Sequence, residues 1–292
     1  MELANLWFGQ PSHTLEQQLE AARQYGFPGL GLLAGGHLPV RERQGINHAA
    51  QGLGADAGRI SVLSLAVLGD EEDSTEPLWR QRTVPQILHT LRTLSCSQLV
   101  VPSGLDARLP LQERASKLEA RVRQGERLSP QDEALEQILV ETGVAMERQL
   151  EPLVAFLYDL RKAAPGLQIA LRPESSAASL LDPARFRMLL EEIPGAEVGY
   201  WHDVGVAEMR AAGGLEEPGA WLDGFANRLQ GTTLHDFAGG AMHLPPGIGA
   251  VDWELLAEYL PRQAKQVLAV APSYPGEVLA EARTSLASRL PA

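Results

Sequence analysis

The chain has 292 residues, 45% of them hydrophobic, which is enough for one large core. Its net charge of -12 at pH 7 argues against a nucleic-acid partner, because proteins that bind phosphate backbones usually present a basic face. The single cysteine, Cys96, excludes an internal disulfide and is typical of a reducing compartment. The N-terminus lacks a signal-peptide pattern, and no apolar run approaches the roughly 20 residues of a membrane span. We therefore expect a cytoplasmic protein without membrane contact.

The first half of the chain alternates short apolar runs with helical patterns. Four apolar runs are predicted strands, over 3–8, 30–34, 60–68 and 98–101. Thr14 is the predicted N-cap of a first helix, because apolar side chains follow it at helical spacing. A further helix is expected over 76–94, with Pro85 as a kink. This alternation predicts parallel strands joined by helical crossovers.

Two helices are predicted after the fourth strand. Residues 105–128 carry interleaved charges of both signs, a pattern typical of a solvated helix. Ser129 and Pro130 predict the start of the second helix, as a cap residue followed by proline at the first position. Apolar residues at helical spacing then continue until Pro165 and Gly166 end the helix. We expect the charged segment at about 105–130 to be a helical insertion after strand four.

The second half repeats the alternation. Predicted strands lie over 167–171, over 198–201, at Thr232 and over 267–270. Two predicted helices begin at Asp182 and at Asp252, and two more cover 218–229 and 275–290. Eight strands that alternate with helices predict an α/β fold, a single (β/α)₈ TIM-barrel domain over 1–292. No Gly-x-Gly-x-x-Gly motif follows the first strand, which weakens a dinucleotide-binding alternative.

The densest polar chemistry of the chain lies between Thr232 and Trp253. His235, Asp236 and His243 fall within nine positions directly after an apolar strand. A Pro-Pro-Gly-Ile-Gly turn follows, and then Val-Asp-Trp at the start of a helix. Since active sites of such barrels lie at the carboxyl ends of the strands, this stretch is a candidate site.

Three stretches together resemble the xylose isomerase-like TIM-barrel superfamily, which includes sugar phosphate isomerases and epimerases and AP endonuclease family 2. The first, YGFPGLGL at 25–32, is similar to the family's entry into strand two. The second, over 169–205, is similar to strands five and six, and the third is the polar stretch just described, with GIGAVDW at 247–253. The resemblance covers nearly the whole chain and implies a xylose isomerase-like barrel.

The resemblance also implies a divalent metal, held by carboxylates on strands five, six and eight and by a histidine on strand seven. Arg172, Thr233 and Ala269 stand at three of these positions, and only Asp203 is kept. Elsewhere in the family pattern Gly31, Val206 and Ala241 also replace expected residues. The chain therefore resembles a member with a degenerate metal site. No cofactor is expected. A Mn, Mg or Zn ion on Asp203, His235 and His243 is the weaker alternative.

Arg172 cannot be a metal ligand, because a guanidinium stays protonated and only donates hydrogen bonds. It would face Asp203 on the neighbouring strand. We expect the guanidinium to occupy the place of the metal and to pair with Asp203, which would keep a positive charge in the barrel mouth.

Three residues are the candidates for catalysis: His235, Glu174 and Asp203. His235 shares strand parity with Thr233 and would face the barrel interior, whereas His202 has the opposite parity. Glu174 lies two residues after Arg172 and would replace the missing carboxylate. The alternatives are a histidine fixed by a loop and a glutamate paired with a surface cation.

The predicted substrate-binding residues are Arg172, His243, Asp236, His37, Trp201 and Tyr274. Asp236 is equally a candidate loop cap, and His37 a solvated loop histidine. Trp201, Tyr274 and Trp7 would form a stacking floor for a sugar or belong to the core. The sequence leaves these alternatives open.

We expect a small-molecule isomerase, epimerase or dehydratase that acts on a sugar-like or polar carbonyl compound without the family's usual divalent metal, whose charge is replaced by fixed charge of the chain. The alternative is a non-catalytic barrel that binds a ligand or partner and has lost the ancestral activity. A homodimer is also possible. AP endonuclease activity is disfavoured by the missing metal histidines and by the acidic charge.

Overall fold

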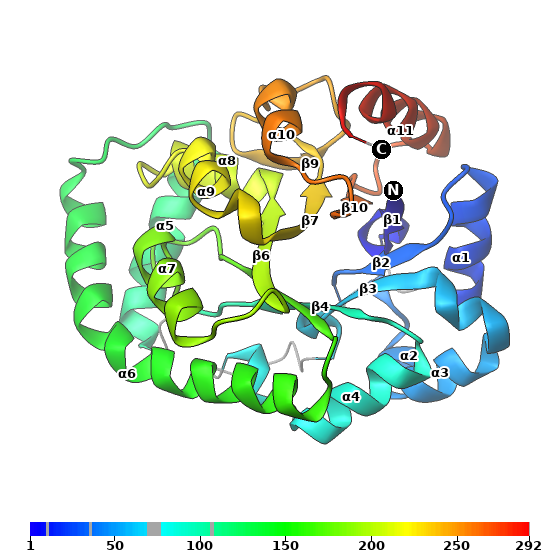
Figure 1. Cartoon of the computed structure of the whole chain (residues 1–292). Helices are drawn as coiled ribbons and strands as arrows, with labels where there is room; N and C mark the ends of the chain where they lie inside the picture. Colours follow the sequence, from blue (N-terminus) through cyan, green and yellow to red (C-terminus); the bar gives the residue numbers. More distant parts are fainter. Residues whose placement is uncertain (10–11, 35–36, 69–76, 106–107, 292) are drawn as a thin grey trace.

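Eight parallel strands close into a barrel in the computed structural model, which describes residues 1–9, 12–34, 37–68, 77–105 and 108–291 (Figure 1). The barrel strands are β1 (Glu2–Ala4), β2 (Leu30–Leu32), β3 (Ile60–Ser64), β4 (Gln98–Pro102), β5 (Gln168–Arg172), β6 (Val198–Asp203), β7 (Leu229–Leu234) and β10 (Lys265–Leu268). Their closed order is β1-β10-β7-β6-β5-β4-β3-β2. The predicted (β/α)₈ barrel is confirmed.

Helices surround the barrel between successive strands (Figure 1). They are α1 (Leu15–Gln24), α2 (Val40–Gln44), α3 (Ile46–Gly52), α4 (Val84–Thr93), α5 (Leu109–Arg123), α6 (Glu133–Ala163), α7 (Pro183–Glu192), α8 (Val204–Ala212), α9 (Pro218–Phe225), α10 (Trp253–Tyr259) and α11 (Gly276–Arg289). Thr14 caps α1 through a capping box, and Asp182 and Asp252 cap α7 and α10, as predicted.

Several predicted boundaries are wrong. The first strand ends at Ala4, and a 3-10 helix (Asn5–Phe8) follows it. Helix α4 begins at Val84, so Pro85 lies in its first turn and does not kink it. Helix α6 begins at Glu133 and not at Ser129, because the Asp132 carboxylate accepts the N–H groups of the first turn. Part of the predicted helix over 76–94, at residue 76, lies outside the described residues.

Two elements were not predicted. Helix α8 follows β6 directly, with Asp203 as its N-cap. Strands β8 (Asp236–Ala238) and β9 (Ala241–Leu244) form an antiparallel hairpin that continues from the end of β7. Both elements lie at the carboxyl end of the barrel and shape its mouth.

The interior of the barrel is filled by side chains. A buried cluster inside it comprises Ala4, Leu33, Val62, Val100, Ala170, Trp201, Val267 and Ala269. Trp201 is its largest member and has no exposed surface. A Cβ on Gly231 of the neighbouring strand β7 would overlap the Trp201 ring, so the small residue there makes room for the indole. The outer faces of the strands pack against the helices in a larger cluster that includes the second half of α6.

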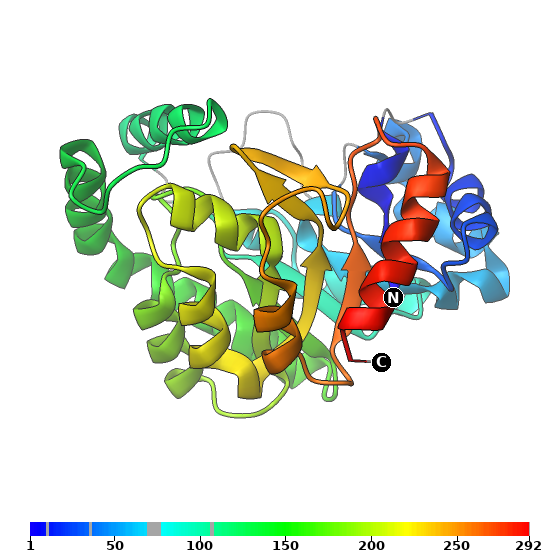
Figure 2. The ribbon, with the colours of Figure 1, turned by 90° about the horizontal axis from the view of Figure 1, so that it is seen from above.

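The inserted helix α5 packs on the barrel through an apolar face. Figure 2 shows α5 and the N-terminal part of α6 extending from one side of the barrel. Their buried side chains join α8 and β8 in a second cluster, made of Leu111, Ala115, Leu118, Val122, Leu128, Leu135, Ile138, Ala178, Met209 and Phe237. The insertion after strand four is thus confirmed as helical, and its charges cover a packed face. None of the helices in the described parts of the chain is both long and apolar enough to cross a membrane.

This packing can be tested by truncating one side chain of α6. Leu135 has 0% exposure in the second cluster, so Leu135→Ala should lower the free energy of unfolding by about 2–5 kcal/mol. Val140 on the same helix is 63% exposed, and Val140→Ala should change it by less than about 0.5 kcal/mol. Urea unfolding monitored by circular dichroism measures both values. Equal small effects would show that the insertion does not pack.

Candidate functional site

Five polar side chains meet at the carboxyl ends of three adjacent strands. Arg172 ends β5, Asp203 ends β6 and His235 follows β7 directly, while Glu174 and His243 lie in the segments beyond. Strands β5, β6 and β7 are neighbours in the closed order, so their ends lie at the same side of the barrel mouth. This is the end where active sites of such barrels lie.

Asp203 is shared between Arg172 and His235. Its Oδ1 lies 3.1 Å from Nε2 of His235, and its Oδ2 lies 3.7 Å from Nη1 of Arg172. Oδ1 also accepts the backbone N–H of Val206 at 3.2 Å, in the first turn of α8. Burial on its own would raise the pKa of Asp203, but the hydrogen bond from His235 and the charge of Arg172 hold that pKa below its usual value. Asp203 is therefore an anion at neutral pH.

His235 is fully buried, and both of its ring nitrogens have partners. The backbone N–H of His243 donates to Nδ1 at 3.0 Å, which makes this nitrogen the acceptor. The carbonyl oxygen of Asp236 lies 3.3 Å from the same atom, but only the N–H can donate to it. The ring proton therefore lies on Nε2 and is donated to Asp203. His235 holds Asp203 in place and has no nitrogen left for a ligand.

His243 is the histidine of the cluster with a ring nitrogen that has no hydrogen-bond partner among the described residues. Its Nδ1 donates to the carbonyl oxygen of Ala269 at 3.1 Å, so Nε2 is an acceptor. No described residue hydrogen-bonds to that Nε2 atom. Burial lowers the pKa of His243 to about 4, so the ring is neutral at pH 7. Its backbone has a φ of 61°, a left-handed conformation that is uncommon outside glycine and often marks functional positions.

Arg172 lies between two carboxylates. Its Nη2 is 3.6 Å from Oε2 of Glu174, opposite the contact with Asp203. The Arg172 and Glu174 side chains are 21% and 24% exposed, so both reach solvent. The Nε atom of Arg172 is buried and has no hydrogen-bond partner among the described residues. The predicted Arg172–Asp203 pair is present, and the guanidinium keeps donors that a ligand could use.

Backbone contacts hold the loop that carries Glu174. Nη1 of Arg210 donates to the carbonyl oxygens of Glu174 at 2.7 Å and of Ser176 at 3.3 Å. Arg210 is 3% exposed and is itself paired with Glu216, 2.7 Å from its Nη2. On the other side, the Ser175 hydroxyl donates to Glu119 of the inserted helix α5 at 2.6 Å. Helices α5 and α8 thus fix the loop between them. Sequence reasoning missed Arg210, because its partners lie far away in the chain.

Asp236 caps the loop after the hairpin. Its carboxylate accepts backbone N–H groups from Phe237 at 2.9 Å, Gly247 at 2.8 Å and Val251 at 3.1 Å. The side chain is 1% exposed, and a Cβ on Gly249 would overlap its Oδ1 atom. The structure thus favours the loop cap over substrate binding for this residue.

The remaining predicted residues lie apart from the five. Trp201 is in the barrel interior, where its indole N–H donates to Thr233 Oγ1 at 2.8 Å. His37 follows β2, the strand opposite β6 in the closed order, and its Nδ1 donates to the Gly9 carbonyl oxygen. The carbonyl oxygen of Tyr274 accepts the Trp7 indole N–H at 2.9 Å. Neither Trp201, with 0% exposure, nor these loop residues joins the Arg172 cluster.

The residues at the strand ends do not fit a divalent metal. Arg172 brings a cation where a ligand would be needed, and Asp203 uses both carboxylate oxygens. Both His235 nitrogens are engaged, and Thr233 accepts the Trp201 N–H. Within the described ranges, no group of three or more His, Cys, Asp or Glu side chains could hold a metal ion.

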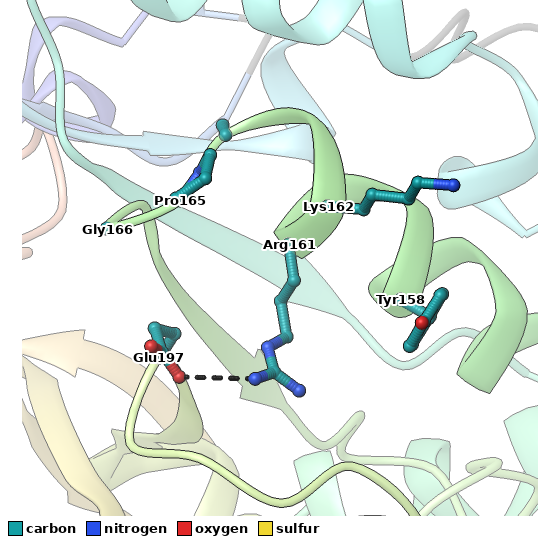
Figure 3. Close-up of a pocket in the computed structure, with 7 residues that line it drawn as sticks. Tyr158, Arg161, Lys162, Pro165, Gly166 and Glu197 are labelled. Carbon is teal, nitrogen blue, oxygen red and sulfur yellow. Dashed lines mark ion pairs between the residues drawn. The ribbon is translucent and has the colours of Figure 1, made fainter.

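A pocket of about 310 Å³ lies at the opposite end of β5. Figure 3 shows its lining at the end of α6, where Arg161 pairs with Glu197 at 3.5 Å. Gly166 precedes β5 and Arg172 ends it, so the strand separates this pocket from the polar cluster. We place the candidate site at the cluster, because the Arg161–Glu197 pocket contains none of the buried, interacting polar groups found there.

Gly205 provides the space for His235, and this can be tested. A Cβ at this position would overlap the His235 ring, so Gly205→Ala should displace the ring and lower the free energy of unfolding by about 1–3 kcal/mol. Gly219, in helix α9, is the matched control, since a Cβ there meets only a Leu255 methyl at 3.9 Å. Gly219→Ala should leave stability unchanged or raise it slightly. Similar losses in the two variants would contradict this role of Gly205.

The contribution of His202 to the stability of the fold should fall as the pH is lowered from about 6.5 to about 4. Burial lowers the pKa of His202 to about 4, and its Nδ1 lies 2.9 Å from the Tyr200 hydroxyl, facing the helices as predicted. In this window the unfolded chain binds a proton that the folded His202 does not, at a cost of about 3 kcal/mol. Urea unfolding across this pH range should show a smaller slope for His202→Gln. His89→Gln, at an exposed position, should keep the wild-type slope.

Comparisons with known proteins agree with the geometry of the barrel. No protein-family model matches the sequence, and no curated protein matches it. Among solved structures, a D-psicose 3-epimerase from Clostridium cellulolyticum has a TM-score of 0.63 at 11% identity, covering 100% of this chain and 99% of its own. A probable 3-DHS dehydratase, AsbF, from Bacillus anthracis has a TM-score of 0.64 at 11% identity, covering 99% and 100%. The IolI protein with a bound zinc atom has a TM-score of 0.59 at 13% identity, covering 98% and 96%.

These structures are similar to the chain over nearly its full length but share little sequence with it. Such low identity shows the fold and leaves the activity open. The chain has the fold of the xylose isomerase-like TIM barrels.

Proposed function

We propose that this chain is an enzyme that isomerises, epimerises or dehydrates a sugar-like or polar carbonyl compound without a divalent metal. The observation that carries the proposal is the Arg172–Asp203 pair at the barrel mouth, where a fixed guanidinium can take over the charge of an ion. Two of the similar structures are named as an epimerase and a dehydratase, and we extend that reaction class to this chain.

In this proposal Glu174 transfers the proton. Its carboxylate, 24% exposed, takes a proton from the carbon next to the substrate carbonyl, and the electron pair of that C–H bond moves to the carbonyl oxygen. Arg172 donates hydrogen bonds to this oxygen and stabilises its negative charge. Return of the proton to the former carbonyl carbon, with the proton of the adjacent hydroxyl passing to the former carbonyl oxygen, gives an isomer. Addition of a proton from solvent to the opposite face of the original carbon, while Glu174 releases its proton to solvent, gives an epimer. Transfer of the proton from Glu174 to a hydroxyl group next to the enediolate lets that group leave as water, while the carbonyl re-forms, and gives a dehydrated product. His235, the other predicted proton-transfer group, lacks an available nitrogen.

The other polar residues have binding and positioning roles. His243 accepts a hydrogen bond from a substrate hydroxyl through Nε2, which its tautomer leaves unprotonated. Asp203 orients Arg172, and His235 orients Asp203 through the 3.1 Å hydrogen bond. Each side chain therefore has a partner that fixes it before a ligand binds, as preorganised charge stabilisation requires.

A second candidate is a barrel that binds a small-molecule ligand without catalysis. The observation that favours it is the complete engagement of His235, the most central histidine of the cluster. The cluster would then recognise a ligand through Arg172 and His243 and transfer no proton.

A thermal-shift screen with ketoses, aldoses and related polyols tests the proposal. A ligand that binds only the folded chain should raise Tm, and Arg172→Met should abolish the increase. Arg161→Met is the matched control, since Arg161 belongs to an Arg–Glu pair at the other end of β5. Turnover of the ligand, followed by ¹H NMR in D₂O through exchange at carbon, distinguishes the enzyme from the binder. No Tm change with any such compound would contradict both.

Metal content tests the other part of the proposal. We expect freshly purified protein to contain less than about 0.1 divalent ion per chain, and EDTA to leave both Tm and activity unchanged. One tightly bound ion per chain, or loss of activity with EDTA, would show that the Arg172 guanidinium does not replace a metal.

A further inference from the structure

The charges around Arg172 do not sum to a cationic site. Glu174 and Asp203 each carry a carboxylate within 3.7 Å of the guanidinium, while His235 and His243 are neutral by tautomer and by burial. One cation and two anions leave the cluster with a charge of about -1. The negative charge of Asp203 stays beside Arg172, because the carboxylate is buried and accepts a hydrogen bond from His235. Whether the guanidinium attracts an anion therefore depends on Glu174.

Glu174 is held in a position from which it neutralises Arg172. Arg210 donates hydrogen bonds to the carbonyl oxygens of Glu174 and Ser176, and its guanidinium forms an ion pair with Glu216. The N–H of Glu174 donates to the Ser179 hydroxyl at 3.3 Å. These contacts anchor the Glu174 backbone beside Arg172, so the carboxylate stays within side-chain reach of the guanidinium when an anion approaches. An incoming carboxylate or phosphate would then meet two negative charges next to the one positive charge.

We propose that Glu174 is a specificity-determining residue that excludes anionic compounds from the mouth, so that the site takes an uncharged polyol with a carbonyl group. Sugar phosphates and sugar acids are rejected because the Arg172 guanidinium is already paired with Glu174 and Asp203 and leaves no cation for their negative charge. An uncharged carbonyl compound fits, since the guanidinium offers donors, Glu174 and His243 offer acceptors, and no net charge is buried. The choice of substrate class rests on the proposed function, whereas the exclusion of anions by Glu174 does not.

Inorganic phosphate is the probe that tests the exclusion. In the wild-type chain, phosphate should produce no Tm increase beyond that of an equal ionic strength of NaCl. Glu174→Gln removes one negative charge and frees the guanidinium, so it should bind phosphate at least about tenfold more tightly. Arg172→Met combined with Glu174→Gln should lose this gain. Isothermal titration calorimetry gives the dissociation constants. It is done at low ionic strength, because salt screens electrostatic interactions least there.

The Arg161–Glu197 pair is the matched control at the other end of β5. Glu197→Gln also removes a carboxylate beside an arginine, at 3.5 Å, but outside the mouth. It should not produce phosphate binding that depends on Arg172. Glu174→Ala serves as a second variant of the same charge change, and circular dichroism shows that each variant is folded.

The outcomes separate the two proposals. Phosphate binding by the wild-type chain, or no gain in folded Glu174→Gln and Glu174→Ala, overturns the exclusion whatever the function is. A gain in these variants supports the exclusion even when no sugar binds the wild-type chain, a result that would defeat only the proposed function. Tighter binding of a ketose phosphate than of the parent ketose by the wild-type chain overturns the assigned substrate class.

Discussion

The Asp203 carboxylate is the group on which the barrel mouth depends. A buried carboxylate is costly unless it is paired and hydrogen-bonded, and Asp203 is 5% exposed. Its two oxygens contact three segments: Arg172 at the end of β5, His235 after β7, and the first turn of α8. The His235 ring then fixes the backbone of His243 and, with it, the hairpin β8–β9. One buried charge thus connects segments that are far apart in the sequence.

A guanidinium in this position differs from a metal ion in more than its charge. It is covalently attached to β5 and donates hydrogen bonds in fixed directions, whereas an ion exchanges and accepts ligands from several directions. At the neighbouring strand ends, Thr233 and Ala269 take part in packing. Thr233 accepts the Trp201 indole N–H, and Ala269 belongs to the buried interior.

The fold could be predicted from the sequence because the evidence for it is local: apolar runs recur eight times, and cap residues and prolines mark several of the helices between them. Helix α8 was missed because Asp203, which lies just after the predicted strand over 198–201, was assigned to the site, and only its N-cap bond to the Val206 N–H shows that a helix begins there. The Arg172–Asp203 pair was predictable, since neighbouring parallel strands end at the same edge. The engagement of both His235 nitrogens was not, because one partner is a backbone N–H that the hairpin brings back.

The inserted helix α5 shows how a segment remote from the site can still support it. Its apolar face packs on α8 and β8, and its Glu119 accepts the Ser175 hydroxyl next to Glu174. From the opposite side, α8 holds the same loop through Arg210. A loop on the surface of a barrel is ordinarily its most mobile part. Here two packed helices hold the backbone of the loop, so the position of Glu174 beside Arg172 depends on packing as well as on charge.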